Sequence, residues 1–180
     1  MQIAREIGLK RVLKYFIFSL WQGIFNLLPF SPLRIWWLTL WGAKIGTDTV
    51  IDSLDFINLD RTGLSGLTIG DRCFIGRGTL LDLAGTITLE NWVTISPRVT
   101  ILSHTTVGFK HHPLFKLYPT HANHTKIYSS SFIGAHSCIL GGITIGPQAL
   151  IAAGSVVTTS IPQKSLAAGN PAVIKKRLKF

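Results

Sequence analysis

A six-residue spacing of aliphatic side chains runs through most of this 180-residue chain and restricts its fold more than any other feature. In the clearest series an aliphatic residue returns at every sixth position from Ile127 to Val157. Shorter series start at Ile69 and Leu89, and a weaker one at Ile45. Because six residues are three strand alternations and not a multiple of 3.6, the spacing predicts short β-strands rather than a helical repeat.

The remaining positions of the hexad predict how these strands assemble. The fifth position carries small or β-branched residues such as Cys73 and Ser137, and the second is often glycine, as at Gly134. We expect both the first and the fifth positions to point inward, including Ile57 in the weak opening series. One hexad cannot bury its aliphatic residue alone, so strands must stack about 4.8 Å apart. About fifteen hexads would form about five triangular turns of an all-β solenoid.

The charge of the chain is sparse and unevenly placed. Charged residues make up 14% of the sequence, too few for a disordered chain, and the net charge is +10. No carboxylate side chain follows Glu90, so an anionic ligand is expected to meet the second half. The basic residues are not interleaved with aromatic residues, so a nucleic-acid partner is not expected. The two cysteines are too few for a disulfide framework.

Residues 1–41 form a separate hydrophobic segment. An uncharged run at 15–33 has the length of a membrane span, but Gly23, Pro29 and Pro32 interrupt it. On a helical wheel one arc collects the polar residues Lys10, Lys14, Gln22 and Asn26. This pattern predicts a basic amphipathic helix over roughly residues 9–28. Two roles remain open for it: lying in a membrane interface, or packing on its own domain or a neighbouring subunit.

The repeats and the segment that closes them resemble a known family. The run 151–158 (IAAGSVVT) and the closing run 168–172 (AGNPA) are similar to those of the hexapeptide-repeat acyltransferases, over about residues 40–178. The nearest resemblance is to the polysaccharide or colanic-acid-type and the galactoside/maltose O-acetyltransferases. It implies a left-handed parallel β-helix over residues 42–174, a basic tail at 175–180, a homotrimer, and acetyl-CoA as co-substrate without a metal.

The hexad pattern breaks between Ile101 and Ile127, and we expect a projecting loop over residues 103–126. The interruption holds five of the six histidines: His104, His111, His112, His121 and His124. Long insertions in a regular scaffold tend to carry function, and histidine can accept a proton near neutral pH. His104 directly follows a coil and matches the catalytic histidine of the resembling family, so we expect it to be the general base. The other four remain without assigned roles, and His136 is expected to be structural.

The resemblance also implies cofactor-binding and acceptor-binding residues. The cofactor set is Ala135, Ala153, Gly154, Thr158, Lys175, Lys176 and Arg177, of which the basic residues would meet the phosphates of coenzyme A. The acceptor set is Arg77 and Asp82. Ala135 stands where galactoside-type relatives have serine, and Arg77 where they have asparagine, so a galactoside acceptor is not favoured. Cys73 should point inward, and Cys138 has no sequence-adjacent base, so we expect direct transfer rather than an acyl-enzyme.

The sequence therefore favours O-acetylation of a sugar or a lipid-linked polysaccharide precursor. We expect a cytoplasmic protein, with peripheral contact at the inner membrane face as an open alternative. Two other functions use the same architecture: a γ-class carbonic-anhydrase-like metalloenzyme and a non-catalytic β-helix scaffold. The spacing of the loop histidines does not match strand-borne metal ligands, which disfavours the metalloenzyme. Amine acylation, acyl chain length and the acceptor are not decided by the sequence.

Overall fold

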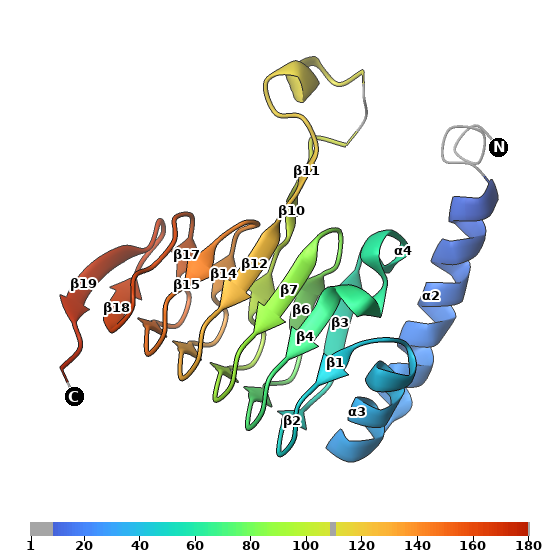
Figure 1. Ribbon diagram of the computed structural model, residues 1–180. Helices are drawn as coiled ribbons and strands as arrows, with labels where there is room; N and C mark the ends of the chain where they lie inside the picture. Colours follow the sequence, from blue (N-terminus) through green and yellow to red (C-terminus); the bar gives the residue numbers. More distant parts are fainter. Residues whose placement is uncertain (1–8, 109–110, 180) are drawn as a thin grey trace.

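Three β-sheets, parallel except for the last strand of the chain, form the faces of a triangular solenoid in the computed structural model, which describes residues 9–108 and 111–179 (Figure 1). Sheet A contains β1 (Lys44–Ile45), β4 (Leu67–Ile69), β7 (Thr86–Leu89), β12 (His124–Ile127) and β15 (Thr144–Ile145). Sheet B contains β2 (Val50–Ile51), β5 (Phe74–Ile75), β8 (Thr94–Ile95), β13 (Phe132–Ile133), β16 (Leu150–Ile151), β18 (Ser165–Ala168) and β19 (Val173–Arg177). Sheet C contains β3 (Leu54–Ile57), β6 (Thr79–Asp82), β9 (Thr100–Ile101), β14 (Cys138–Ile139) and β17 (Val156–Val157).

Each turn of the solenoid contributes one strand to each sheet, and equivalent hexad positions lie directly above one another. In sheet B, for example, Ile75 is in register with Ile95, and Ile133 with Ile151. These first-position side chains are fully buried, and fifth-position residues such as Ser137 are buried as well. The hydroxyl group of Ser137 is satisfied by the backbone, since its Oγ donates to the Ala152 carbonyl at 3.0 Å. The predicted inward positions and the stacking of the turns are confirmed for the regular hexads.

The first turn departs from the prediction at Ile57, which is 38% exposed. In β3 the inward residues are Leu54 and Phe56, which pair in register with Thr79 and Leu81 of β6. The corner before β3 has one residue fewer than the corner before β6, so the alternation of inward and outward positions is reversed. The prediction that Ile57 points inward was wrong because it assumed a constant corner length.

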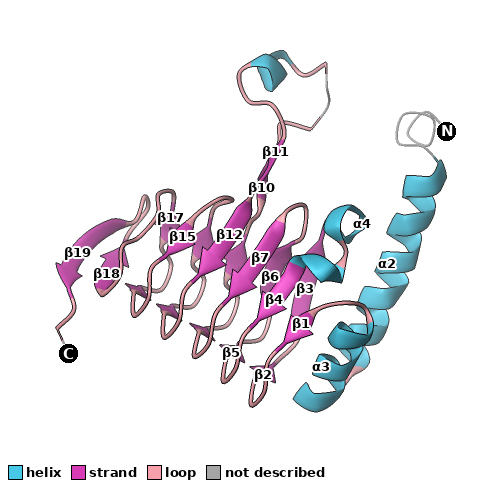
Figure 2. Ribbon diagram, in the orientation of Figure 1, coloured by secondary structure: helices cyan, strands magenta, loops and turns pink. Residues whose placement is uncertain are grey.

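Two helices cover the open end of the first turn, as Figure 2 shows, where the sequence pattern predicted one. Helix α2 (Leu9–Leu27) confirms the helix predicted at 9–28, and α3 (Ser31–Leu40) follows after a short break at Pro29. Trp21 and Phe25 of α2 are buried with their rings stacked 5.6 Å apart, and both meet Phe56 edge-on. None of the described helices has the length and apolar character that a membrane span needs.

The side chain of Gln22 in α2 forms hydrogen bonds with the backbone of β3, the edge strand of sheet C. Its Nε2 donates to the Leu54 carbonyl at 2.8 Å, and its Oε1 accepts from the Phe56 N–H at 3.1 Å. An edge strand leaves backbone groups unpaired, and an amide side chain offers both the donor and the acceptor that they need. Gln22 therefore faces the solenoid instead of lying on a water-facing arc. The side chain of Lys10, predicted on the same arc, lies outside the described side chains.

The remaining irregular segments lie at corners and at the far end. A short helix α4 (Leu59–Thr62) and a 3₁₀ turn η1 (Leu64–Gly66) follow β3. The predicted loop leaves the solenoid on a two-stranded ribbon of β10 (His104–Thr105) and β11 (His121–Ala122), and a 3₁₀ turn η2 (Pro113–Lys116) lies near its tip. The regular strands resume at His124, before the predicted loop end at residue 126. Lys175, Lys176 and Arg177 belong to β19 and not to a tail, because β19 pairs with β18.

We predict opposite effects for two glycine-to-alanine substitutions. A Cβ at Gly76 would lie 2.6 Å from Pro97 N and 2.8 Å from the Ser96 carbonyl carbon of the next turn. Gly76→Ala should therefore lower the free energy of unfolding by about 1–3 kcal/mol, as overpacking does. Gly23→Ala, with nothing within 4 Å of the added carbon, should raise it by about 0.5–1 kcal/mol through helix propensity. Urea unfolding followed by circular dichroism measures both, and equal shifts would contradict the close coil-to-coil approach.

Candidate active site

His104 begins β10 at the point where the chain leaves sheet C for the projecting loop. We call this corner, between sheets C and A, the histidine corner; in the last full turn it contains Thr158. The two residues before His104 continue from β9, whose Ile101 is fully buried, so the imidazole is carried by a packed strand. Its side chain is 14% exposed. His104 is thus anchored in the scaffold yet open on one side.

Asp82, at the end of β6, lies directly behind the imidazole. His104 Nδ1 and Asp82 Oδ2 are 2.5 Å apart, and Asp82 is completely buried. The other contacts of the carboxylate are the Ser103 N–H at 2.9 Å and Ser103 Oγ at 3.2 Å on Oδ2, and Asn58 Nδ2 at 2.7 Å and the Ala84 N–H at 3.1 Å on Oδ1. All these groups are donors, so the cluster is arranged around an ionised carboxylate.

Burial opposes ionisation of Asp82, but hydrogen bonds, led by those from His104 and Asn58, outweigh it. The pKa of this carboxyl consequently lies below its usual range. An ionised Asp82 accepts the proton of His104 Nδ1, which leaves the lone pair of the imidazole on Nε2. The geometry therefore prepares Nε2 to receive a proton from a group outside the solenoid.

The burial of Asp82 changes its expected role. We predicted contact between Asp82 and the acceptor, but no part of this side chain is exposed and both oxygens are already hydrogen-bonded. Asp82 instead positions His104. Its place could be found from the repeat, because Leu81 stacks beneath Ile101 and the residues after each strand reach the same corner.

Two further residues support this pair and were not found from the sequence. Asn58, which holds Asp82 Oδ1, has a left-handed backbone (φ 59°) just before α4, outside the hexad pattern. Gly141 of the following turn lies over His104, and a Cβ there would be 2.9 Å from the His104 N atom. Gly141 stands at the third position of its hexad, two residues after Ile139, and only the stacking shows which residue it covers.

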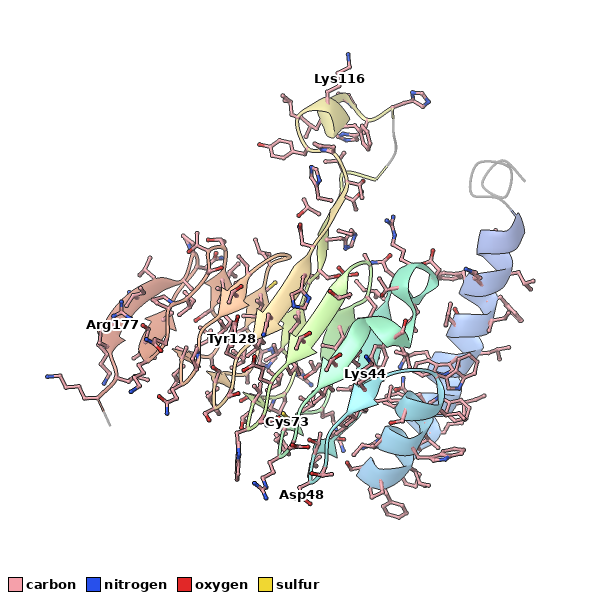
Figure 3. All side chains as sticks on the ribbon, in the orientation of Figure 1. Lys44, Asp48, Cys73, Lys116, Tyr128 and Arg177 are labelled. Atoms are coloured by element: carbon pink, nitrogen blue, oxygen red, sulfur yellow. The ribbon has the colours of Figure 1, made fainter. Side chains whose placement is uncertain are left out.

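The other histidines are distributed over the loop and the neighbouring corners. His124 Nδ1 is 2.6 Å from Thr86 Oγ1, and His121 is paired with Thr105 in the ribbon. His112 Nδ1 accepts from the Leu114 N–H and so caps η2, while His111 is exposed near the tip. In Figure 3, Lys116 marks this tip, well away from the solenoid. Among residues 9–108 and 111–179 no three His, Cys, Asp or Glu side chains gather as a metal site would need.

Three of the seven predicted cofactor residues lie at a different corner. Ala135, Ala153 and Gly154 belong to the corner between sheets B and C, which we call the alanine corner; Arg77 is at the same corner in an earlier turn. Ala153 and Gly154 are exposed, and neither Ala135 nor Ala153 uses its backbone N–H in a hydrogen bond within the described chain. These two donors are therefore left for a ligand of the backbone, since buried or half-buried N–H groups normally find a partner.

The remaining predicted residues are also spread out. Thr158 shares the histidine corner but lies two turns further along the solenoid. Lys175 and Lys176 are exposed on β19, and Arg177 Nη1 donates to the Gln163 carbonyl at 3.1 Å and to Ser165 Oγ at 3.2 Å. Arg177 is labelled at the far end of the solenoid in Figure 3. A single chain thus brings Asp82 to His104 but does not bring the alanine corner to it.

The repeats of this chain are similar to those of known acyltransferases. The family model described as the hexapeptide repeat of succinyl-transferase matches residues 129–159. Serine acetyltransferase 4 of Arabidopsis thaliana is 36% identical over 107 residues, which are 59% of this chain and 28% of that protein. The mitochondrial serine acetyltransferase 3 of the same plant is 41% identical over 98 residues, 54% of this chain and 24% of that protein. The chain therefore spans less than a third of the length of these curated relatives.

Solved structures match over most of the chain. A galactoside acetyltransferase in complex with coenzyme A superposes with a TM-score of 0.77 at 26% identity and covers 89% of this chain and 78% of its own. A maltose O-acetyltransferase from Clostridium difficile 630 gives a TM-score of 0.73 at 23% identity, with 90% and 84% coverage. The predicted fold, a left-handed parallel β-helix of hexapeptide repeats, is confirmed. The repeat model, the acetyltransferase relatives and this shared fold support the resemblance to the hexapeptide-repeat acyltransferases.

Proposed function

We propose that this protein is an O-acetyltransferase that moves an acetyl group from acetyl-CoA to a hydroxyl group of a sugar or a polysaccharide precursor. The observation that carries the proposal is the buried Asp82 carboxylate on His104 Nδ1, which leaves Nε2 as a base at the protein surface. Relatives named as acetyltransferases, and a structural neighbour that holds coenzyme A, support acetyl-CoA as the donor.

In the proposed reaction His104 Nε2 takes the proton of the acceptor hydroxyl as its oxygen attacks the thioester carbonyl. The C–S bond then breaks, and the thiolate of coenzyme A receives the proton from the imidazolium. A free backbone N–H at the alanine corner is suited to the oxygen that becomes negative during the attack. Burial raises the pKa of both the Cys73 and the Cys138 thiol, which disfavours a thiolate nucleophile and supports direct transfer.

The active unit in this proposal is a homotrimer. Within one chain His104 and Ala153 lie at different corners, with sheet C between them. A second solenoid packed alongside can place its alanine corner opposite the histidine corner of the first, and three copies close the ring. Each trimer would then hold three sites, each built from two subunits, with Lys175 and Lys176 available to the phosphates of the donor.

Two groups of similar proteins bear on the class of acceptor. A galactoside acetyltransferase and a maltose O-acetyltransferase share the fold, whereas the curated sequence relatives are serine acetyltransferases. Serine is therefore the competing acceptor, and both acceptors present a hydroxyl group to the same base. Arg77, exposed at the alanine corner and 3.7 Å from Asp52 through its Nε atom, is the proposed acceptor contact.

We place the enzyme peripherally at the inner face of a membrane.

The function is tested by release of the coenzyme A thiol over a panel of sugars, lipid-linked sugars, serine and amino sugars. We expect turnover with at least one sugar hydroxyl, at least tenfold above serine and above the matched amine. Mass spectrometry of the product locates the acetyl group. Preference for serine or for an amine would overturn the sugar O-acetylation proposal, and hydrolysis-level release with every acceptor would favour a non-catalytic scaffold.

The roles of His104 and Asp82 predict a specific pattern of kinetic losses. His104→Ala should lower kcat by about 10²–10⁴-fold because the base is removed. Asp82→Asn should lower kcat by about 10–10³-fold with an unchanged KM for acetyl-CoA, because the imidazole loses its orienting carboxylate. His111→Ala, in the exposed loop, is the control and should retain wild-type kcat. An active, folded His104→Ala protein would exclude the proposed base.

A site shared between subunits predicts complementation of two inactive variants. Ala153→Arg fills the alanine corner and leaves His104 intact, while His104→Ala does the reverse. Randomly mixed trimers of the two should recover roughly a quarter of the sites, since each mixed trimer contains one interface with both corners intact. Refolded or co-expressed mixtures are assayed by thiol release, with each variant alone as the control. Mixtures no more active than the separate variants would contradict the shared site.

A further inference from the structure

The outward side of α2 carries an unpartnered apolar stripe. Its members recur at intervals of three and four residues and are all exposed: Leu13, Phe16, Ile17, Leu20, Ile24 and Leu27. They lie on a different side of the helix from Trp21 and Phe25, which are buried against the first turn. Leu27 is 81% exposed and Phe16 is 62% exposed. One helix therefore has two apolar sides, of which the solenoid covers only one.

Helix α3 also has exposed apolar side chains. Phe30 in the break before α3 and Leu33, Trp36, Leu40 and Trp41 along and after it are exposed, while Leu38 is buried. Trp36 and Leu40 are separated by one helical turn and so lie on one side of α3. We call the exposed apolar residues of α2 and α3 together the end-cap surface. Monomers rarely expose apolar side chains in such continuity unless something covers them.

The charges around the end-cap surface favour a lipid bilayer as the occupant. From residue 9 to residue 47 the chain has five bases and no carboxylate side chain. Arg34 is paired with Asp52 of the first turn at 3.3 Å, so the excess is carried by Lys10, Arg11, Lys14 and Lys44. A second copy or a basic protein would meet this excess with like charge, whereas anionic lipid headgroups are complementary to it. Exposed Trp36 and Trp41 fit the same environment, because tryptophan favours the interface between headgroups and acyl chains.

We propose that the end-cap surface inserts into an anionic bilayer interface and holds the solenoid axis perpendicular to the membrane. The two helices cover the β1–β3 end of the solenoid, while β18 and β19 lie at the other end, so the surface faces along the axis (Figure 1). In the proposed trimer, on which this inference partly rests, side-by-side solenoids present three such surfaces in one plane. Three shallow insertions then act together, which strengthens binding without a membrane span.

This orientation sets the height of the active site. The strand β9 before His104 lies two inter-strand steps, about 10 Å, from β3 of the first turn. The α2 layer adds about 10 Å, the diameter of a helix with its side chains. His104 would therefore stand about 20 Å from the outer side of the end cap. A sugar carried by a membrane lipid can reach this height through its headgroup, so the arrangement selects lipid-linked acceptors.

The test compares two pairs of charge substitutions in the full-length protein. Leu20→Glu with Leu27→Glu places two carboxylates on the end-cap surface. Ser19→Glu with Asn26→Glu adds the same charge one residue away on the same helix, off the apolar stripe. Co-sedimentation uses vesicles of phosphatidylcholine with phosphatidylglycerol, and vesicles of phosphatidylcholine alone. We expect wild-type binding to the anionic vesicles, a loss of at least tenfold for the leucine pair, and at most a threefold loss for the control pair.

Three results would overturn the proposal. Wild-type protein that does not sediment with anionic vesicles excludes a bilayer as the occupant. Equal losses in both pairs would show that only charge, and not insertion, matters. Leucine-pair variants that change the oligomer size in sedimentation equilibrium, with no vesicle binding by wild type, would identify the surface as a contact between copies. Thiol release with a soluble acceptor should be unchanged in the leucine pair, so failure of the enzyme proposal is seen separately.

The orientation has its own measurement. Quenching by lipids brominated in their acyl chains should affect Trp36 and Trp41 and spare Trp92, which lies at a corner of the third turn. Trp36→Phe with Trp41→Phe should therefore remove most of the quenching, and Trp92→Phe should leave the quenched fluorescence unchanged. Strong quenching of Trp92 would show that the solenoid lies flat on the bilayer and would contradict the perpendicular orientation.

Discussion

Backbone hydrogen bonding between successive turns determines almost everything else in this structure. Each strand of sheet A pairs in parallel with the strand of the next turn without a shift, so Ile69 lies above Ile45 and Leu89 above Ile69. Side chains at one hexad position therefore form columns, and aliphatic columns fill the interior. Close approach of the turns excludes a Cβ at corners such as Gly76. The same constraint aligns the corners, so residues distant in the sequence, such as Asp82 and His104, become neighbours.

This constraint explains how much of the fold could be predicted. A period of six is set by the alternation of strands and by the need to bury one aliphatic and one small residue per side, so it is visible in the sequence. Corner length is not visible in that period. The first turn is one residue short at one corner, and Phe56 replaces Ile57 as the inward residue. The use of Gln22 to pair the edge of β3 likewise depends on where α2 packs, which no local pattern encodes.

The candidate site shows the same division. His104 was predicted to be the base because it follows a strand, begins the break in the repeat and matches the catalytic histidine of the resembling family; that role stays a prediction. The function of Asp82 was misjudged because burial depends on which side of a corner the side chain takes, and a position after a strand can face either way. Asn58 was missed since it belongs to an irregular insertion, and its contact with Asp82 arises only from the stacking of β3 on β6. The irregular residue Asn58 thus comes into contact with Asp82 only because the regular strands β3 and β6 are stacked in register.

A solenoid with parallel strands also separates tasks along its length. The first turn is closed by α2 and α3, which pair the strand edge through Gln22 on one side and leave an apolar surface on the other. The middle turns hold the proposed base, and the last turns carry unpaired backbone N–H groups and the basic strand β19. An end cap needs only a covered strand edge, so the second apolar side of α2 has no structural purpose within the chain. That excess of exposed apolar side chains, and not the amphipathic pattern alone, is the physical reason for assigning the cap a partner.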